Sequence, residues 1–330
     1  MRKMTIEDIS RDTGLSRGTV SRALNDRPDI STQTKQRVLE ACRKLNYVPS
    51  YAARSLATGR NYAVAVLADN LRSAFTASFL RGVISRAQQS HYAVHVVEPG
   101  PNPPAEQLAA FSPERIDAVL NAIPLDAPRA SKLRRSMENR VLTSCWPFDG
   151  VTCDVLTPDQ AEAGRLVARF LVRNGIREIL YVHHPTRSGA AERLNGFHEI
   201  CRENAIDPEA VTATITDLST LDGLAPRLER AQAVVATDDF LAITLMMLCA
   251  RLARRPGEDL AVIGHGNEAA AAEIHPALTT IDFAGEEIGR RSMETALQRL
   301  GRERSDAPQH IRIAPSLVQR GSTRHLGDAR

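Results

Sequence analysis

The sequence has no cysteine pattern that would indicate a disulfide framework or a metal site. Its five cysteines are odd in number, are widely spaced among 330 residues, and mostly have apolar neighbours. We therefore expect all of them to be reduced, as in a protein of a reducing cytoplasm. They are Cys42, Cys145, Cys153, Cys201 and Cys249.

Signals for membranes, secretion and common enzyme chemistry are also missing. The longest apolar stretch, residues 241–250, is too short to cross a bilayer, and MRKMTIEDIS lacks the apolar segment of a signal peptide. His183 and His184 have no third metal ligand at a useful spacing. The motifs GxxxxGK[ST], GxSxG and HExxH are absent. We therefore expect a cytoplasmic protein that does not contact membranes, is not an enzyme, and binds no cofactor or metal.

Positive charge is concentrated at the N-terminal end. Residues 1–60 hold 12 Lys and Arg against 6 Asp and Glu, whereas the remainder holds 30 against 33. A basic head on a mildly acidic body is typical of a protein that offers one end to nucleic-acid phosphates. The chain is also longer than one typical domain, so a small head and a larger body fit its length.

Residues 5–46 predict three short helices. Thr5 with Asp8, then Ser16, then Ser31, occupy the positions of helix N-caps, where a side-chain oxygen takes an unpaired backbone N–H. Gly14 allows a tight turn between the first two helices. Two helices joined by such a turn and supported by a third form a helix-turn-helix module.

The second predicted helix has a face suited to reading DNA. If Val20 and Leu24 are buried, the opposite face presents Arg17, Ser21 and Arg22. A recognition helix lies in the major groove, where Arg can donate two hydrogen bonds to guanine, with about 1–3 kcal/mol of discrimination. Taken alone, this pattern fits equally well a solvated polar face of a small helical subdomain.

The run from Ile6 to Gly59 resembles the headpiece of the lactose-repressor (LacI/GalR) family. The matching segments are TIEDIS, GLSRGTVSRALN, STQTKQRV and LNYVPSYAARSLATG. In that family the last segment is a hinge helix that orders on operator DNA, pairs across a dimer and inserts a leucine into the minor groove. The resemblance implies that Leu56 is this wedge; the alternative is a core residue of a linker helix. The residues predicted to contact DNA are Thr5, Ser16, Arg17, Gly18, Thr19, Ser21, Arg22, Asn25, Ser31, Thr34, Tyr47, Ala53 and Leu56.

After Gly59, short β-rich runs alternate with amphipathic helices, as in parallel sheets covered on both faces. Among these runs we expect strands at 233–236 and 259–263 and a helix at 220–230. The segments LRGVISRA, ERLNGFHE, ATDDFLA, AVIGHGN, PALTTID and SLVQRGST resemble the rest of the same family. The resemblance implies an all-α helix-turn-helix head and an α/β two-lobed periplasmic-binding-protein-like body, in which a helix at 285–301 returns the chain to the first lobe. The expected domains are a DNA-binding head at 1–46, a hinge at 47–60, and an effector-binding and dimerisation domain at 61–330. Within it, lobe 1 covers about 61–157 and 285–316, and lobe 2 covers about 158–284 and 317–330.

A ligand of such a body is expected beyond the carboxyl ends of the strands. Arg193 stands at the family's effector-gripping position and can fork onto hydroxyls or a carboxylate; alternatively it is a surface arginine in an ion pair. Asp238 either accepts from ligand hydroxyls or caps a helix, and Trp146 either stacks on a sugar or lies in the core. The predicted effector-binding residues are Asp69, Phe75, Trp146, Arg193, Thr237, Asp238, His265 and Asn267.

This site departs from the family pattern where a pair of aspartates is usual, because the chain has Gly266 and Asn267. With His265 and Arg193 close by, we expect a pocket that tolerates an anion, and we predict a sugar acid. The chain is thus predicted to be a ligand-responsive repressor that binds a pseudo-palindromic operator as a homodimer. The alternatives from other classes are an enzyme and a transport-type sugar-binding protein.

Overall fold

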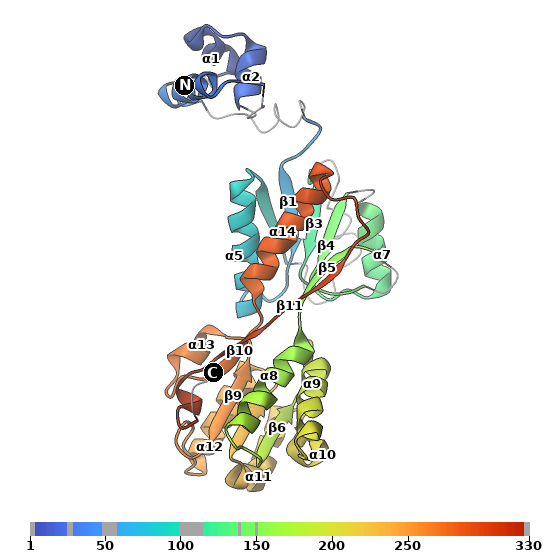
Figure 1. Ribbon diagram of the computed structural model, residues 1–330, viewed down its shortest axis with the longest axis vertical. Coiled ribbons are helices and arrows are strands. Elements are labelled where there is room, and N and C mark those ends of the chain that lie inside the picture. Colours follow the sequence, from blue (N-terminus) through green and yellow to red (C-terminus); the bar gives the residue numbers. More distant parts are fainter. Residues whose placement is uncertain are drawn as a thin grey trace. The chain divides into compact units, whose positions relative to one another are not determined.

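The computed structural model describes residues 4–24, 29–47, 58–98, 115–137, 140–148 and 151–326. The chain forms two compact units, Met1–Tyr62 and Ala63–Arg330 (Figure 1). The N-terminal unit contains three helices among its described residues, α1 (Ile6–Thr13), α2 (Arg17–Leu24) and α3 (Thr32–Lys44). Gly14, at φ 68°, makes the turn between α1 and α2. The three helices bury one small core around Ile9, Val20 and Val38, as the helix-turn-helix pattern predicted.

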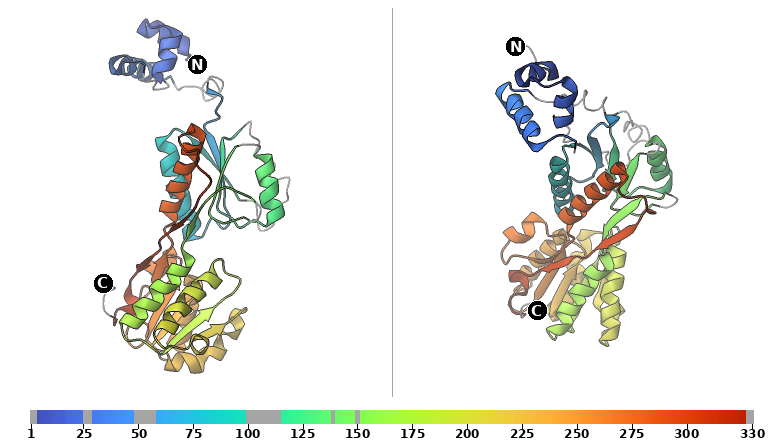
Figure 2. Two further views of the ribbon diagram at one scale, coloured as in Figure 1. Left: turned by 45° about the vertical axis from the view of Figure 1, so that its right-hand side comes forward. Right: turned by 45° about the horizontal axis from the view of Figure 1, so that its top comes forward.

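The C-terminal unit consists of two lobes, each built on a six-stranded sheet (Figures 1 and 2). The sheet of lobe 1 has the order β11-β5-β4-β3-β1-β2, and every strand pair in it is parallel. Helices α5 and α14 lie side by side on one face, and α7 lies on the other. The elements of lobe 1 are β1 (Ala63–Leu67), α5 (Ala74–Gln89), β2 (Ala93–Val97), β3 (Ala118–Asn121), α7 (Ala127–Ser136), β4 (Val141–Ser144), β5 (Asp154–Pro158), α14 (Gly285–Gly301) and β11 (His310–Ile313).

Lobe 2 repeats this architecture with the order β12-β10-β9-β8-β6-β7, in which only β12 runs antiparallel among the described strands. Helices α8 and α9 cover one face, and α11 and α12 cover the other. The elements are α8 (Gln160–Arg173), β6 (Ile179–His183), α9 (Ala190–Glu203), α10 (Pro208–Val211), β7 (Thr212–Thr214), a 3₁₀ helix η1 (Leu218–Leu224), α11 (Ala225–Arg230), β8 (Ala233–Ala236), α12 (Asp239–Arg251), β9 (Ala261–His265), α13 (Ala269–Glu273), β10 (Thr279–Asp282), β12 (Ser316–Val318) and the 3₁₀ turn η2 (Gly321–Thr323).

The chain passes between the lobes three times: from β5 to α8, from β10 to α14, and from β11 to β12. This confirms the predicted fold class, a helix-turn-helix head followed by a two-lobed α/β body. One predicted strand is displaced: β9 covers 261–265 rather than 259–263, so His265 is the last residue of the strand. The predicted helix at 220–230 is split, because η1 precedes α11 and Pro226 stands in the first turn of α11.

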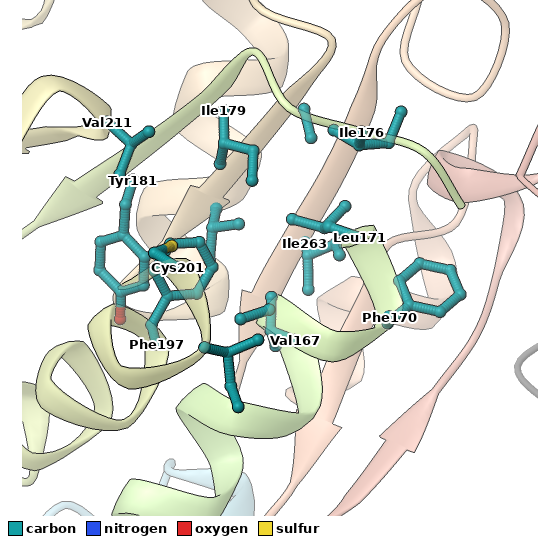
Figure 3. Packing of buried hydrophobic residues seen from close by; sticks show 14 of the residues in the cluster. Val167, Phe170, Leu171, Ile176, Ile179, Tyr181, Phe197, Cys201, Val211 and Ile263 are labelled. Atoms are coloured by element: carbon teal, nitrogen blue, oxygen red, sulfur yellow. The ribbon is translucent and has the colours of Figure 1, made fainter. Parts of the chain in front are cut away.

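Helix α9 is held close to α8 by glycines on both helices. A Cβ on Gly164 would lie 1.9 Å from the backbone oxygen of Arg193, and one on Gly196 would lie 1.9 Å from that of Ala161. Next to this contact, the rings of Tyr181 and Phe197 pack with 4.9 Å between their centroids (Figure 3). The close packing fixes the backbone of Arg193, whose side chain reaches the ends of the lobe 2 strands.

Candidate functional site

In the head, several predicted DNA contacts also form helix caps. The Ser16 hydroxyl accepts the backbone N–H of Thr19 at 3.1 Å, and the Ser31 hydroxyl accepts that of Thr34 at 3.2 Å. Thr5 instead donates its backbone N–H and its hydroxyl to the Asp8 carboxylate, each at 2.9 Å. Ser16 and Ser31 are exposed, so the beginnings of α2 and α3 are open to an incoming phosphate.

The outer face of α2 is polar and accessible. Val20 and Ala23 are buried, whereas Arg17, Gly18 and Arg22 are exposed; Thr19 and Ser21 are half-buried. The Arg22 guanidinium lies 3.3 Å from the Asp29 carboxylate, and both side chains are more than half exposed. Such a pair contributes little to stability, about 0–1 kcal/mol, and yields readily to a nucleic-acid partner.

Other predicted DNA contacts are placed differently. The Tyr47 side chain is half-buried against the head core, and burial beside Cys42 raises the pKa of its hydroxyl. Asn25, Ala53 and Leu56 lie outside the described residues.

In the body, a cavity of about 520 Å³ lies between the lobes at the carboxyl ends of the strands. Its wall contains seven of the eight predicted effector-binding residues. Asp69, Phe75 and Trp146 come from lobe 1, and Arg193, Thr237, Asp238 and His265 come from lobe 2. Sequence reasoning missed other wall residues, among them Gln160, Arg187, Glu268 and Phe283.

Arg193 is a buried cation at the floor of this cavity, with 3% of its surface exposed. It donates to Gln160 Oε1 at 2.5 Å, to the Ser188 carbonyl at 3.0 Å and to the Thr237 carbonyl at 3.2 Å. Its guanidinium carbon lies 5.4 Å from the centroid of the Phe283 ring. Burial lowers the pKa of Arg193, and the charge of Asp238 opposes that shift. These neutral acceptors hold a positive charge against the cavity, so Arg193 is not the surface arginine of the alternative reading.

The neighbouring Asp238 serves as a helix cap and an ion-pair partner. One carboxylate oxygen accepts the Leu241 N–H at 2.8 Å at the start of α12, and the other lies 2.8 Å from Arg187 Nε. The Thr237 hydroxyl is also occupied, since it donates to the Val182 carbonyl at 3.0 Å and accepts the His184 N–H at 2.8 Å. Both residues therefore shape the wall through protein contacts that a ligand would have to share.

His265 and Asn267 differ from the expectation that they favour an anion. Burial and the charge of Arg193 lower the pKa of His265 to about 3, so its ring is neutral and adds no positive charge. Asn267 does not belong to the described wall of this cavity. Its amide donates to Asp282 at 2.7 Å and accepts from Arg320 at 2.6 Å. The side chain of Asn267 is thus held by other residues of lobe 2.

On the lobe 1 side, Trp146 is partly packed into the protein and partly open to the cavity, between the two predicted alternatives of a core residue and a residue that stacks on a sugar. Its indole N–H donates to the Ala122 carbonyl at 3.2 Å, and its half-buried ring lines the cavity. Phe75, in the first turn of α5, stacks on Phe79 at 6.4 Å between ring centroids. Asp69 is exposed at the mouth, and partial desolvation raises its pKa.

Glu268 links the two lobes across the cavity. It stands at the N-cap of α13 in lobe 2, and its two carboxylate oxygens lie 3.1 and 3.0 Å from the backbone nitrogen of Ala74 in lobe 1. Ala74 begins α5, whose own N-cap Ser73 makes no side-chain cap hydrogen bond. Glu268 therefore caps a helix of the opposite lobe, a contact between residues 194 positions apart that no local sequence pattern signals.

The described residues contain no group of three or more His, Cys, Asp or Glu that could hold a metal ion. Within the same part of the chain, no helix is both long and apolar enough for a membrane span.

Two family models match the chain. One, described as bacterial regulatory proteins, lacI family, matches residues 5–50; the other, a periplasmic binding protein-like domain, matches residues 168–323. The HTH-type transcriptional repressor PurR of Edwardsiella ictaluri is 27% identical over 332 residues, which cover 96% of each chain.

Solved structures share the architecture over nearly the whole length. The lac repressor dimer bound to operator and the anti-inducer ONPF has a TM-score of 0.74 at 23% identity, covering 98% of this chain and 99% of that one. The complex of the transcriptional regulator CelR with cellobiose has a TM-score of 0.68 at 22% identity, covering 97% and 100%.

Proposed function

The chain belongs to the lacI family of bacterial regulatory proteins, and on that premise we propose that it is a ligand-responsive repressor of transcription. The observation that carries this proposal is the exposed face of α2, where Arg17, Gly18 and Arg22 stand over a buried helix-turn-helix core. That face is suited to base edges in the major groove, and Arg17 and Arg22 are the proposed base-reading residues. The protein would act on operator DNA in the cytoplasm, and we assign it no catalytic role.

The division of labour along the chain is part of the proposal. Residues 1–46 would bind DNA, 47–60 would form the hinge with Leu56 as a minor-groove wedge, and 61–330 would bind the effector and dimerise. Leu56→Ala should then leave the fold intact but weaken operator binding. Unchanged affinity and unchanged DNA bending would remove the wedge from the proposal.

A homodimer is supported by apolar side chains exposed on both lobes. Lobe 1 exposes Leu71, Ile84 and Val96, and lobe 2 exposes Met247 by 69%. An apolar groove of about 610 Å³ lies next to Met247 along α12. Apolar surface on both lobes fits a second copy of the chain, and two heads would then meet the two halves of a pseudo-palindromic operator. The substitution Met247→Glu should shift the protein toward monomer in light scattering.

We propose that the effector is a small carbohydrate-like molecule held between the lobes, and that a sugar acid would place its carboxylate at Arg193. Arg193 is buried without a carboxylate hydrogen-bond partner in the described residues, so a ligand carboxylate would offset a costly charge. Asp69 at the mouth would accept hydrogen bonds from ligand hydroxyls. A ligand that changes the lobe arrangement would change the spacing of the two hinges, and by linkage operator DNA would change ligand affinity by the same factor.

Thermal shifts against sugars, sugar acids, polyols and nucleosides test the effector proposal. A ligand at 100 times its Kd adds about 2.7 kcal/mol to the free energy of unfolding, which is readily seen. Arg193→Ala should abolish both the shift and the effect of the ligand on DNA binding, while DNA binding itself remains. A normal response in Arg193→Ala would show that the effector binds elsewhere.

A further inference from the structure

His265 carries an unpaired acceptor atom at the wall of the ligand cavity. Its Nδ1 lies 2.8 Å from the Ala236 carbonyl, which can only accept, so Nδ1 carries the proton. The other ring nitrogen, Nε2, therefore carries a lone pair and can accept a hydrogen bond. Nε2 has no hydrogen-bond partner among the described residues, and His265 exposes only 2% of its surface.

The ring is fixed in this state by its neighbours. It stacks on Phe283 at 6.4 Å between centroids and 17° between planes, and the Arg193 guanidinium lies over the same Phe283 ring. Arg193 donates to the Thr237 carbonyl, next along the chain from the carbonyl that His265 binds. A donor that is always charged and an acceptor that is neutral thus converge on one part of the wall. Burial and Arg193 also lower the pKa of His265 to about 3, so the acceptor persists at physiological pH.

We infer that His265 Nε2 and Arg193 together select the ligand by its pattern of donors and acceptors. This inference rests on the proposed effector site. The ligand presents an oxygen that accepts from Arg193 and, beside it, an O–H that donates to His265. A hydroxy acid with its carboxylate at Arg193 satisfies this pattern, and so does a vicinal diol. A carboxylate or phosphate oxygen facing His265 is excluded, because two acceptors would meet without a proton in a dry site.

The tautomer is tested without any ligand. The full-length chain is labelled with ¹⁵N-histidine for NMR spectroscopy. The His265 signals are identified by their loss in His265→Phe, or in His265→Asn if the first variant does not fold. We expect a protonated Nδ1 and an unprotonated Nε2 from pH 8 to pH 5. A proton on Nε2, or an imidazolium at pH 6, would overturn the inference.

Selection is then measured with D-gluconate, D-glucuronate, D-glucose and D-ribose, and with singly deoxygenated analogues of each compound that binds. One ligand hydroxyl is expected to donate to His265. Removing that hydroxyl should weaken binding at least 100-fold in the wild type but only a few-fold in His265→Phe. The control is His183→Phe, since His183 is also buried with an unpaired ring nitrogen but does not line the cavity. It should keep the full 100-fold selection.

Equal losses in wild type and His265→Phe, or no binding by any of the four compounds, would overturn the inference. Sequence-specific DNA binding by the same preparation would show that the repressor proposal survives that failure.

Discussion

Removing the Glu268 carboxylate should loosen the arrangement of the two lobes. Glu268 accepts the Ala74 N–H at the beginning of α5, so Glu268→Ala leaves that helix start uncapped and removes a hydrogen bond between the lobes. A hydrogen bond to a charged group contributes about 1.5–3 kcal/mol, and half exposure of Glu268 favours the lower end. A loss of about 1.5 kcal/mol corresponds to a roughly tenfold shift in the equilibrium between lobe arrangements.

Two measurements on the ligand-free protein report this shift. The first is hydrogen exchange of the Ala74 amide, which should quicken by about tenfold if opening of this contact limits exchange. The second is the distance distribution between spin labels at two exposed positions, Ser85 on α5 and Ala272 on α13, which should broaden. Glu268→Gln keeps an acceptor without the charge and should give an intermediate result.

The matched control is Glu273→Ala, which removes an exposed carboxylate from the same short helix α13. It should change neither measurement. If Glu268→Ala also left both unchanged, the carboxylate would not hold the lobes, and the reasoning from helix capping would be refuted.

Three further predictions concern the head, the helix crossing and a buried acid. Asp29→Asn should tighten DNA binding by up to about fivefold in fluorescence anisotropy, because it frees Arg22 from a weak ion pair; weaker binding would contradict this. Gly164→Ala should lower the free energy of unfolding by about 2 kcal/mol in urea, because its Cβ meets the Arg193 carbonyl, whereas Gly223→Ala, with open space around it, should not. Burial raises the pKa of Asp239 to about 6, so its folded state holds the proton more tightly and stability should fall as pH rises from about 4 to about 7. That slope should disappear in Asp239→Asn; an unchanged slope would assign it to other groups.

The elements that sequence reasoning found are those with strong local signals. The strand at 233–236 has the predicted bounds, because its four apolar residues are all buried, and the helix at 285–301 has the bounds that the family resemblance implied. The caps at Ser16 and Ser31 were also predictable, since the hydroxyl bonds a backbone N–H only three residues away.

Elements with weak or polar patterns were missed. Strand β11, HIRI, is an edge strand in which only Ile313 is buried, and α7, APRASKLRRS, contains few apolar residues. Their places depend on pairing with distant segments: β11 pairs with β5, some 155 residues earlier. Sequence alone therefore gave no periodicity that distinguishes them from loops.

The candidate cavity shows the same division. Residues just beyond the ends of strands, such as Asp69 and Asp238, could be placed at its wall because parallel strands end on one edge of the sheet. The state of each side chain could not be predicted, since it depends on non-local contacts. The His265 ring is neutral because burial and the charge of Arg193 lower its pKa. The Asn267 side chain does not line the cavity, because Asp282 and Arg320 bind its amide.

Selection of DNA from a random library by the full-length protein tests the proposed function most directly. We expect a two-fold symmetric consensus, bound with a steep loss of affinity as salt rises, and a relaxed consensus at one base pair of each half when Arg17 or Arg22 is changed to Ala. A library that yields no consensus, or one that Arg17→Ala and Arg22→Ala leave equally sharp, would contradict sequence-specific recognition through α2.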